Sequence, residues 1–280
     1  MTDHADQPNV ARIYDYLLGG KDHFAADREA AQRLIAALPN AAAVAQANRA
    51  FLAAAVRHAA RAGIAQYLDI GAGLPTSPSV HECAREIIPG ARVAYIDSDP
   101  AAVAQAQALL ATGDGVIVTK GDARDPEAIL ASPALAGVLD LTEPVCLLLV
   151  SMLHFFTAGE ADMIVGTFRQ RMAPGSFLII SQGHSGPAPR ASIQAAYGGS
   201  ITLTGRPVAE IAAYFDGFDL VPPGLVPVAD WAAAQPDTQP DAQPEAQPPP
   251  GQPAPPASPQ AGMLAGVGRK RAAVSGLRCL

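Results

Sequence analysis

The stretch from Tyr67 to Pro100, YLDIGAGLPTSPSVHECAREIIPGARVAYIDSDP, decides how the chain folds. It predicts a short apolar strand at residues 67–70, a glycine-rich turn, a helix and a second strand at residues 92–96. Glycine at Gly71 and Gly73 can take positive φ and lets a ligand approach the bare backbone closely. The stretch is therefore expected to form a βαβ unit, with either an ordinary tight turn or a ligand site at the turn.

The helix of this unit carries its own start signal. Ser77 is placed as the N-cap with Pro78 at the first helical position, which suits both residue types. Apolar residues then recur at the spacing of one buried helix face: Val80, Cys83, Ala84, Ile87 and Ile88.

Two aspartates of the unit indicate its ligand. Asp69 lies in the first strand just ahead of Gly71, and Asp97 ends the second strand. A carboxylate at the tip of the second strand can accept hydrogen bonds from both hydroxyls of a ribose. The unit therefore favours a ligand that contains adenosine.

Two classes of adenosine ligand compete for this pattern. A dinucleotide fold shows G-x-G-x-x-G and binds the pyrophosphate at the helix N-terminus. Here Pro75 stands where another glycine would be expected. An aspartate ahead of G-x-G, followed by an acidic second strand, resembles the first two motifs of class I methyltransferases that use S-adenosyl-L-methionine (SAM). An NAD-type oxidoreductase stays as the alternative.

Composition sets further limits on the 280-residue chain. Its net charge of −7 gives no electrostatic reason to expect nucleic acid or an anionic membrane as partner. The cysteines Cys83, Cys146 and Cys279 are far apart, which argues against a disulfide framework or a structural metal and fits a reducing cytoplasm. The polar N-terminus lacks a signal-peptide core, and the longest apolar run, residues 145–156, is too short to span a bilayer. We expect a cytoplasmic protein that binds no metal.

The chain divides into five parts by pattern. Three amphipathic helices are expected in an N-terminal helical cap, residues 1–63, ahead of a nucleotide-binding core, residues 64–234. Residues 235–260 repeat Gln-Pro and have few apolar side chains to bury, which predicts a disordered insertion. Residues 261–270 supply the last strand, and residues 271–280 form a basic tail.

Within these parts, cap signals and apolar runs locate the other elements. Helix starts are expected at four capping residues: Asp27, Asp99, Asp125 and Thr157. Further strands are expected at residues 116–119, 145–150, 177–181 and 263–267. Residues 185–205 are interpreted as a loop, residues 206–215 as a helix and residues 220–228 as a strand-like run.

Longer blocks of the sequence resemble one family. ARIYDYLLGGKDHFAADREAA, QANRAFL, LDIGAGLPTSPSVHE, YIDSDP, GDARDPEAIL, LLLVSMLHF, YFDGFDLVPPGLVPV and AGVGRK look like the SAM-dependent methyltransferase family abundant in actinobacteria, once called DUF574. The resemblance implies an α/β, class I (Rossmann-like) fold with a seven-stranded, mostly parallel sheet and an antiparallel last strand. Ala72, where threonine or serine is more usual, and the Gln-Pro insertion depart from the family pattern.

The resemblance also implies cofactor contacts. Asp69, Gly71 and Gly73 would line the methionine end of SAM, and Asp97 would bind the ribose; the alternatives are a structural turn and simple exposure at a strand end. Asp122, with Ala123 beside it, matches the position that contacts the adenine amino group, and Arg124 is expected to pair with a nearby carboxylate. Ser151 leaves the fourth strand toward the same site.

Arginine-carboxylate pairing suggests a further contact to the methionine end. Asn48 and Arg49 on the third helix would reach the cofactor carboxylate; the alternative is an ordinary exposed helix face.

The sequence indicates the catalytic and substrate-binding residues less clearly than the cofactor-binding residues. Methyl transfer needs alignment of acceptor and methyl group, and sometimes removal of a proton. His154 is the best-placed general base or substrate ligand, against a packing histidine, and His184 is a weaker candidate. Tyr14, Lys21, Asp22 and His23 are expected to close over the ligand, or else to form a polar linker between helices.

The sequence thus predicts a SAM-dependent methyltransferase that acts on an unidentified acceptor, with a small molecule preferred. A SAM-binding regulator without transferase activity is the alternative from another class, and the pattern does not address the oligomeric state. Cofactor binding without turnover on any acceptor would favour the regulator.

The Gln-Pro tract should be dispensable for folding. Replacing residues 235–260 with a short Gly/Ser linker is expected to leave the thermal midpoint nearly unchanged, because the entropy of closing a loop depends only logarithmically on its length. Thermal unfolding and SAM titration of parent and variant check this. A large drop in the midpoint, or lost SAM binding, would show that the tract is packed or functional.

Overall fold

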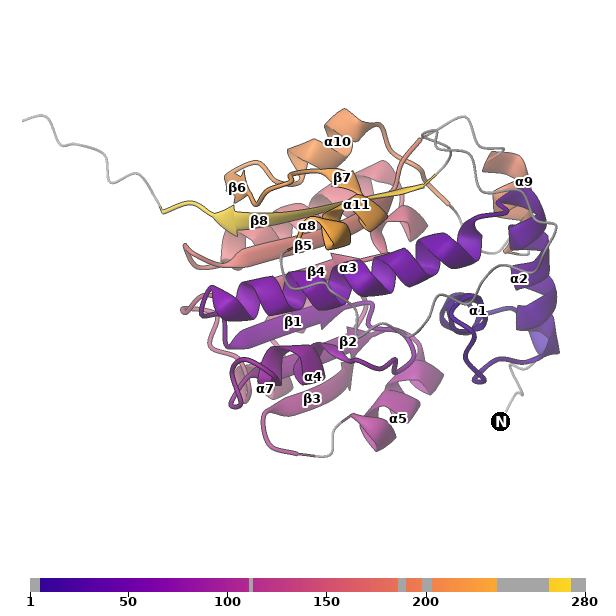
Figure 1. Ribbon diagram of the computed structural model, residues 1–280. Helices are drawn as coiled ribbons and strands as arrows, with labels where there is room; N and C mark the ends of the chain where they lie inside the picture. Colours follow the sequence, from indigo (N-terminus) through magenta and orange to yellow (C-terminus); the bar gives the residue numbers. More distant parts are fainter. Residues whose placement is uncertain (1–5, 111–112, 186–189, 198–202, 236–261, 273–280) are drawn as a thin grey trace, which may run out of the picture.

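A mostly parallel sheet forms the centre of the protein (Figure 1). The computed structural model describes residues 6–110, 113–185, 190–197, 203–235 and 262–272. The strands follow the order β3-β2-β1-β4-β5-β8-β6, and the two-residue β7 also pairs with β8. Strand β8 runs antiparallel to β5, β6 and β7. The expected class, with an antiparallel last strand, is confirmed, and β7 is an addition to the seven strands.

The strand bounds follow the apolar runs closely. They are β1 Gln66–Ile70, β2 Arg92–Asp97, β3 Val116–Lys120, β4 Cys146–Val150, β5 Phe177–Gly183, β6 Phe218–Leu220, β7 Val226–Pro227 and β8 Met263–Lys270. All five residues of β1 are buried, and so are the first four of β4. Such continuous burial is typical of central parallel strands that are covered on both faces.

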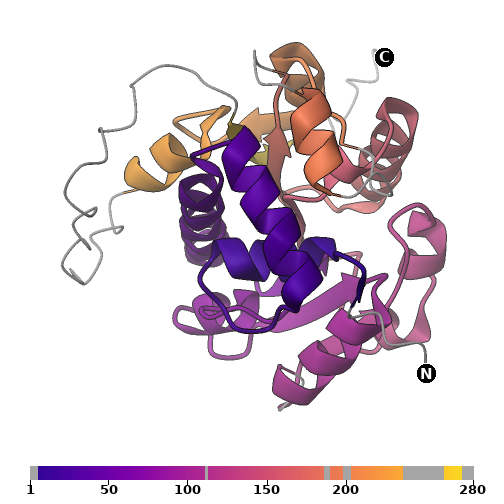
Figure 2. The same cartoon turned by 90° about the vertical axis from the view of Figure 1, so that its right-hand side faces the viewer.

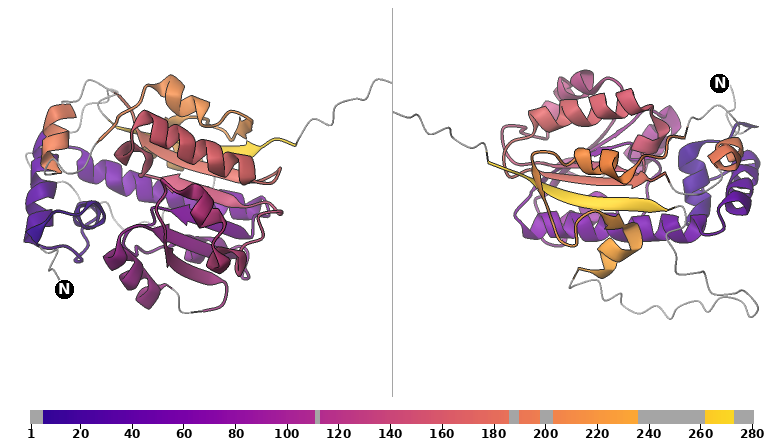
Figure 3. Two further views of the ribbon diagram at one scale, coloured as in Figure 1. Left: turned by 180° about the vertical axis from the view of Figure 1, so that it is seen from behind. Right: turned by 90° about the horizontal axis from the view of Figure 1, so that it is seen from above.

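Helices cover both faces of this sheet (Figure 3). The core helices are α3 Ala41–Arg61, α4 Val80–Arg85, α5 Pro100–Leu109, α6 Pro126–Leu130, α7 Pro133–Ala136, α8 Ala158–Arg171, α10 Val208–Ala213 and α11 Val228–Ala233. Side chains of α3, α4, α5 and α11 share one hydrophobic cluster with the sheet, and those of α6, α7, α8 and α10 share the other. The protein is therefore a three-layer α/β fold.

The N-terminal helices lie at one end of the sheet, together with a later helix (Figures 1 and 2). Helices α1 Val10–Leu17 and α2 Ala25–Ala37 pack with the start of α3 and with α9 Arg190–Ala196 in a third cluster that includes Ile13 and Leu34. The rest of α3 runs across the sheet, where Phe51 and Val56 are fully buried. Helix α3 thus links this group of helices to the core.

Two expected helix caps are wrong. The N-cap of α4 is Ser79 and not Ser77: the Ser79 hydroxyl accepts from the Glu82 amide, and the Glu82 carboxylate accepts from the Ser79 amide at 2.6 Å. This reciprocal pair satisfies two free amides, which a serine two residues earlier would not do. The helix also ends at Arg85, before the last expected apolar positions.

Asp27 is not the N-cap of α2 either; it is the third residue of that helix, and its carboxylate caps the helix from there by accepting from the amide of the N-cap Phe24. Its fully buried carboxylate accepts from the Phe24 amide at 2.8 Å, the Asn9 amide at 2.8 Å and Arg12 Nε at 2.6 Å. The expected caps Asp99, Asp125 and Thr157 are confirmed.

Three further segments differ from expectation. The interpreted loop at residues 185–205 contains α9, and the strand-like run at residues 220–228 is split between β6 and β7. Helix α11 was not anticipated; its Trp231 is fully buried and its ring meets that of Phe51 edge-on at 5.2 Å. The Gln-Pro tract from residue 236 and the tail from residue 273 lie outside the described residues.

The Asp27 carboxylate should contribute strongly to the stability of the N-terminal helices. Asp27→Ala removes the acceptor of two backbone amides and of the Arg12 guanidinium, so it is expected to lower the free energy of unfolding by about 3–5 kcal/mol. Urea unfolding measures this, with Glu29→Ala, an exposed site on the same helix, as the control. Equal stability of the two variants would contradict this role.

Candidate functional site

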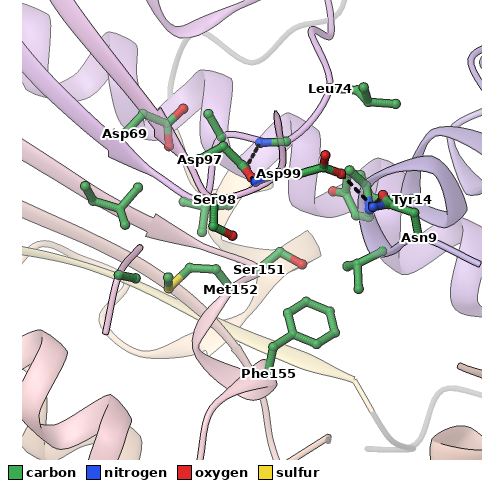
Figure 4. A pocket seen from close by; sticks show the side chains of 18 of the residues that line it. Asn9, Tyr14, Asp69, Leu74, Asp97, Ser98, Asp99, Ser151, Met152 and Phe155 are labelled. Carbon is green, nitrogen blue, oxygen red and sulfur yellow. Dashed lines mark hydrogen bonds between the residues drawn. The ribbon is translucent and has the colours of Figure 1, made fainter. Parts of the chain in front are cut away.

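A cavity of about 480 Å³ lies at the carboxyl edge of the parallel strands, beneath the N-terminal helices (Figure 4). Its walls come from the turns that follow β1, β2, β3 and β4, and from α1 and α3. This volume falls within the range of small-molecule and cofactor sites, and this edge is where doubly wound sheets bind their ligands.

The turn after β1 brings bare backbone to the cavity. Gly71 has φ of +73° and Gly73 has φ of +66°, a region that side chains disfavour. A Cβ atom on Gly71 would also stand 3.1 Å from Met152 Cβ. Glycine is therefore required at Gly71 both for its backbone conformation and for close packing.

Asp97 at the end of β2 is tied to this turn. Its Oδ2 accepts from the Gly73 amide at 2.7 Å, and its Oδ1 accepts from the Asp99 amide at 2.9 Å (Figure 4). Burial is the largest cause that raises the pKa of Asp97 above its usual range. Each carboxylate oxygen has more than one acceptor position, so the group can still accept from a ligand.

Asp69 is the buried acid of the site. Its side chain is 6% exposed, and the described part of the chain provides no hydrogen bond to its carboxylate. Burial raises its pKa to about 7, although Arg49 favours the charged form and the nearby Asp97 opposes it. A carboxylate in this state has much to gain from a cationic partner in the cavity.

Helices α1 and α3 contribute polar groups opposite these acids. Asn48 Nδ2 donates to the Tyr14 hydroxyl at 2.9 Å, and that hydroxyl donates to the Ala45 carbonyl at 3.1 Å. Asn48 Oδ1 is buried and has no partner among the described residues. Arg49 lines the cavity and donates to the Pro78 carbonyl at 2.7 Å.

Asp122 and Ala123 follow β3 and line the same cavity. The Asp122 carboxylate pairs with Arg124 at 2.9 Å, and this pairing lowers the pKa of Asp122. The expected ion pair of Arg124 is thereby confirmed.

The segment after β4 carries Ser151 and His154. Ser151 has a left-handed backbone, with φ of 57°, and its amide donates to Ser181 Oγ at 2.9 Å. The short helical turn η2, Leu153–Phe155, then presents His154, whose Nδ1 is buried and has no partner among the described residues. Burial, and then the Arg206 guanidinium, lower the pKa of His154 to about 4, so the ring is neutral near pH 7.

Not every expected residue lines this cavity. Lys21, Asp22 and His23 lie outside its lining, and the Asp22 carboxylate accepts from Gln105 on α5 at 2.7 Å. His184 lines a smaller pocket next to it. The lid role of Lys21 and Asp22 stays a prediction.

Sequence reasoning missed several cavity residues: Asn9, Met152, Phe155 and Tyr197. Asn9 caps α1, and its Nδ2 donates to Asp99 at 2.6 Å, which joins the N-terminal helices to β2 (Figure 4). An asparagine before an amphipathic run was a readable signal for this cap. No comparable signal in the sequence pointed to Tyr197, because the helix α9 that precedes it was not expected.

The residues present fit SAM. The unpartnered Asp69 carboxylate and Asn48 carbonyl suit its charged amino group, and Asp97 at a strand tip suits the ribose diol. No group of three or more metal-ligating side chains occurs within the described ranges. Over the same ranges, no helix is both long enough and apolar enough to cross a membrane.

Comparisons with known proteins agree with this assignment. A family model described as S-adenosyl methyltransferase matches residues 3–271. A crystal structure of a putative methyltransferase from Thermobifida fusca is 35% identical, covers 95% of this chain and 96% of its own, and superposes with a TM-score of 0.81. A DUF574 family protein from Streptomyces avermitilis is 34% identical, with 95% and 99% covered and the same TM-score.

No significant match was found among curated proteins. The match over nearly the whole chain favours methyl transfer over the NAD-type alternative. The chain belongs to the S-adenosyl methyltransferase family and is a SAM-dependent methyltransferase with a class I fold.

Proposed function

We propose that the enzyme methylates a small molecule at the cavity beneath the N-terminal helices. The observation that carries this proposal is the convergence of Asp69, Asp97 and Asn48 on one cavity, which three different elements bring together. The site lies under α1 and beside Tyr197, so a small acceptor suits it better than a protein surface or a nucleic acid. The net charge of −7 also disfavours a polyanionic acceptor.

Within this proposal, the cofactor residues hold the two ends of SAM. Asp69 and Arg49 bind the charged methionine end, Gly71 and Gly73 provide the bare backbone beside it, and Asp97 binds the ribose. Asp122 and Ala123 border the adenine, with Ser151 near the reacting centre. When bound, SAM supplies an electrophilic methyl group on its sulfonium sulfur.

His154 is proposed as the residue that accepts a hydrogen bond from the acceptor and so orients it. A neutral imidazole is the form that can do so, and both burial and Arg206 favour this form. Tyr14, hydrogen-bonded to Asn48, forms part of the wall on the side of the N-terminal helices.

We infer a cytoplasmic location for the enzyme. Cys83 and Cys146 are buried free thiols, which fits a reducing compartment. An actinobacterial source remains an inference from the resemblance of the sequence blocks.

The Asp97 carboxylate should carry much of the affinity for SAM. A hydrogen bond to a charged group contributes roughly 1.5–3 kcal/mol, so Asp97→Ala is expected to weaken SAM binding about 10- to 100-fold. Calorimetry on folded protein measures this. Asp114→Ala, at an exposed aspartate before β3, is the control and should bind as the parent does. Unchanged affinity in a folded Asp97→Ala variant would refute the ribose assignment.

SAM affinity should rise with pH through the pKa of Asp69. That pKa is about 7 in the free protein because of burial, and a bound cation would favour the carboxylate and lower it. Between pH 6 and pH 8 the charged fraction of Asp69 rises from about one tenth to about nine tenths, so affinity should rise up to about tenfold.

The Asp69→Asn variant isolates this effect from the titration of SAM itself and of Asp97. Calorimetry at pH 6, 7 and 8 should give a steeper pH dependence for the parent than for Asp69→Asn. The same slope in both proteins would show that Asp69 does not face the cationic end of SAM.

A further inference from the structure

A second pocket of about 170 Å³ adjoins the cofactor cavity, and we call it the side pocket. It lies between α1, α2, the start of α3, α9 and the end of β5. Four residues line both spaces: Tyr14, Ser151, His154 and Tyr197. Two of these four residues, Tyr14 and Ser151, are labelled in Figure 4. A molecule in the side pocket would therefore reach the reacting end of the cofactor cavity.

The described lining of the side pocket combines an apolar part with neutral polar groups. Leucines from α1 and α2, Val44 from α3 and Ile193 from α9 form the apolar part, and the hydroxyl groups and the histidines His154 and His184 form the polar part. None of the described residues in its lining is a lysine, arginine, aspartate or glutamate. A charged group would lose its hydration there without gaining a counter-ion, which is costly. The occupant must be neutral where it enters this pocket.

The size of the side pocket sets the size of that occupant. An apolar cavity of about 150 Å³ accommodates benzene. The 170 Å³ of the side pocket therefore fits one six-membered ring, and not a nucleoside or a peptide segment.

His154 supplies a polar contact at the junction of the two spaces. Its ring is neutral near pH 7, and its Nδ1 is buried and has no partner among the described residues. Arg206, itself 1% exposed, donates to the carbonyls of Phe156 at 3.2 Å and Thr157 at 2.9 Å, and so fixes the turn that carries His154. A neutral imidazole held in this way is ready to accept a hydrogen bond from a hydroxyl group.

We propose that the side pocket binds the ring of the methyl acceptor, a neutral molecule with one aromatic or alicyclic ring, whose hydroxyl donates a hydrogen bond to His154. This inference rests on the proposed function, because it takes the adjoining cavity as the SAM site. It adds the substrate class: small neutral ring alcohols or phenols, and neither phosphorylated nor carboxylated compounds.

Fragment binding tests the location. With the full chain saturated with S-adenosylhomocysteine, phenol is expected to bind saturably in ligand-observed NMR. Val44→Phe fills the side pocket without touching the cofactor cavity, so it should weaken phenol binding about tenfold or more. Ala43→Phe, at an exposed neighbour on the same helix that lines neither space, should bind phenol as the parent does.

Two further comparisons test the chemical class. Cyclohexanol should compete with phenol, whereas benzoate, with a similar ring and a negative charge, should bind at least about tenfold more weakly. His154→Phe keeps a ring at the junction but removes the acceptor, so it should weaken phenol binding about tenfold while leaving benzene binding nearly unchanged.

SAM calorimetry on every variant separates the two proposals. Normal SAM binding with no saturable phenol binding, or with phenol binding equal in the parent and Val44→Phe, overturns the side pocket and leaves the proposed cofactor site standing. Benzoate binding as tight as that of phenol overturns the neutral class. Absence of SAM binding by the parent would overturn the proposed cofactor site and, with it, this inference.

Discussion

The hydrogen bond from the Gly73 amide to the Asp97 carboxylate is the contact on which the site depends. It joins the turn after β1 to the end of β2, two segments that parallel pairing already brings to one edge of the sheet. The bond requires Gly73 in a left-handed backbone, and Gly71 must take the same conformation to pass close to Met152. One carboxylate thus shapes the glycine turn and also lines the cavity.

The N-terminal helices cover the cavity because hydrogen bonds of charged and polar side chains hold them against the edge of the sheet. The Asp27 carboxylate accepts hydrogen bonds from Arg12 and from the amides of Asn9 and Phe24. The Asn9 side chain in turn donates to Asp99, which follows β2. Helix α3 continues from this group of helices across the sheet, where its apolar face is buried. The wall of the cavity and the hydrophobic core are therefore built on the same helix.

Features that depend on residues close together in the sequence could be predicted, and features that depend on contacts between distant residues could not. Periodicity and glycine spacing located β1, β2 and β4, because those signals are local, and the aspartates Asp69, Asp97 and Asp122 that follow from this pattern and from the family resemblance line one cavity. Helix α9, with the sequence RASIQAA, was missed because the Gly, Ser and Pro residues that flank it in the sequence favour a loop. In the structure it packs on α2. The side pocket and the buried role of Asp27 also depend on contacts between distant segments, which no local pattern reports.

The protein leaves several buried polar groups without partners around these two spaces. Asp69 lacks a donor, and Asn48 Oδ1 and His154 Nδ1 lack partners, all within the described residues. Each such group costs stability when it is buried alone, so folded proteins keep few of them. Their positions on β1, α3 and η2 are explained if bound molecules complete them: a cation beside Asp69 and a hydroxyl beside His154. The unsatisfied groups thus lower the stability of the free enzyme, and ligands that supplied the missing partners would offset this cost, which is the balance expected at a site preorganised for catalysis.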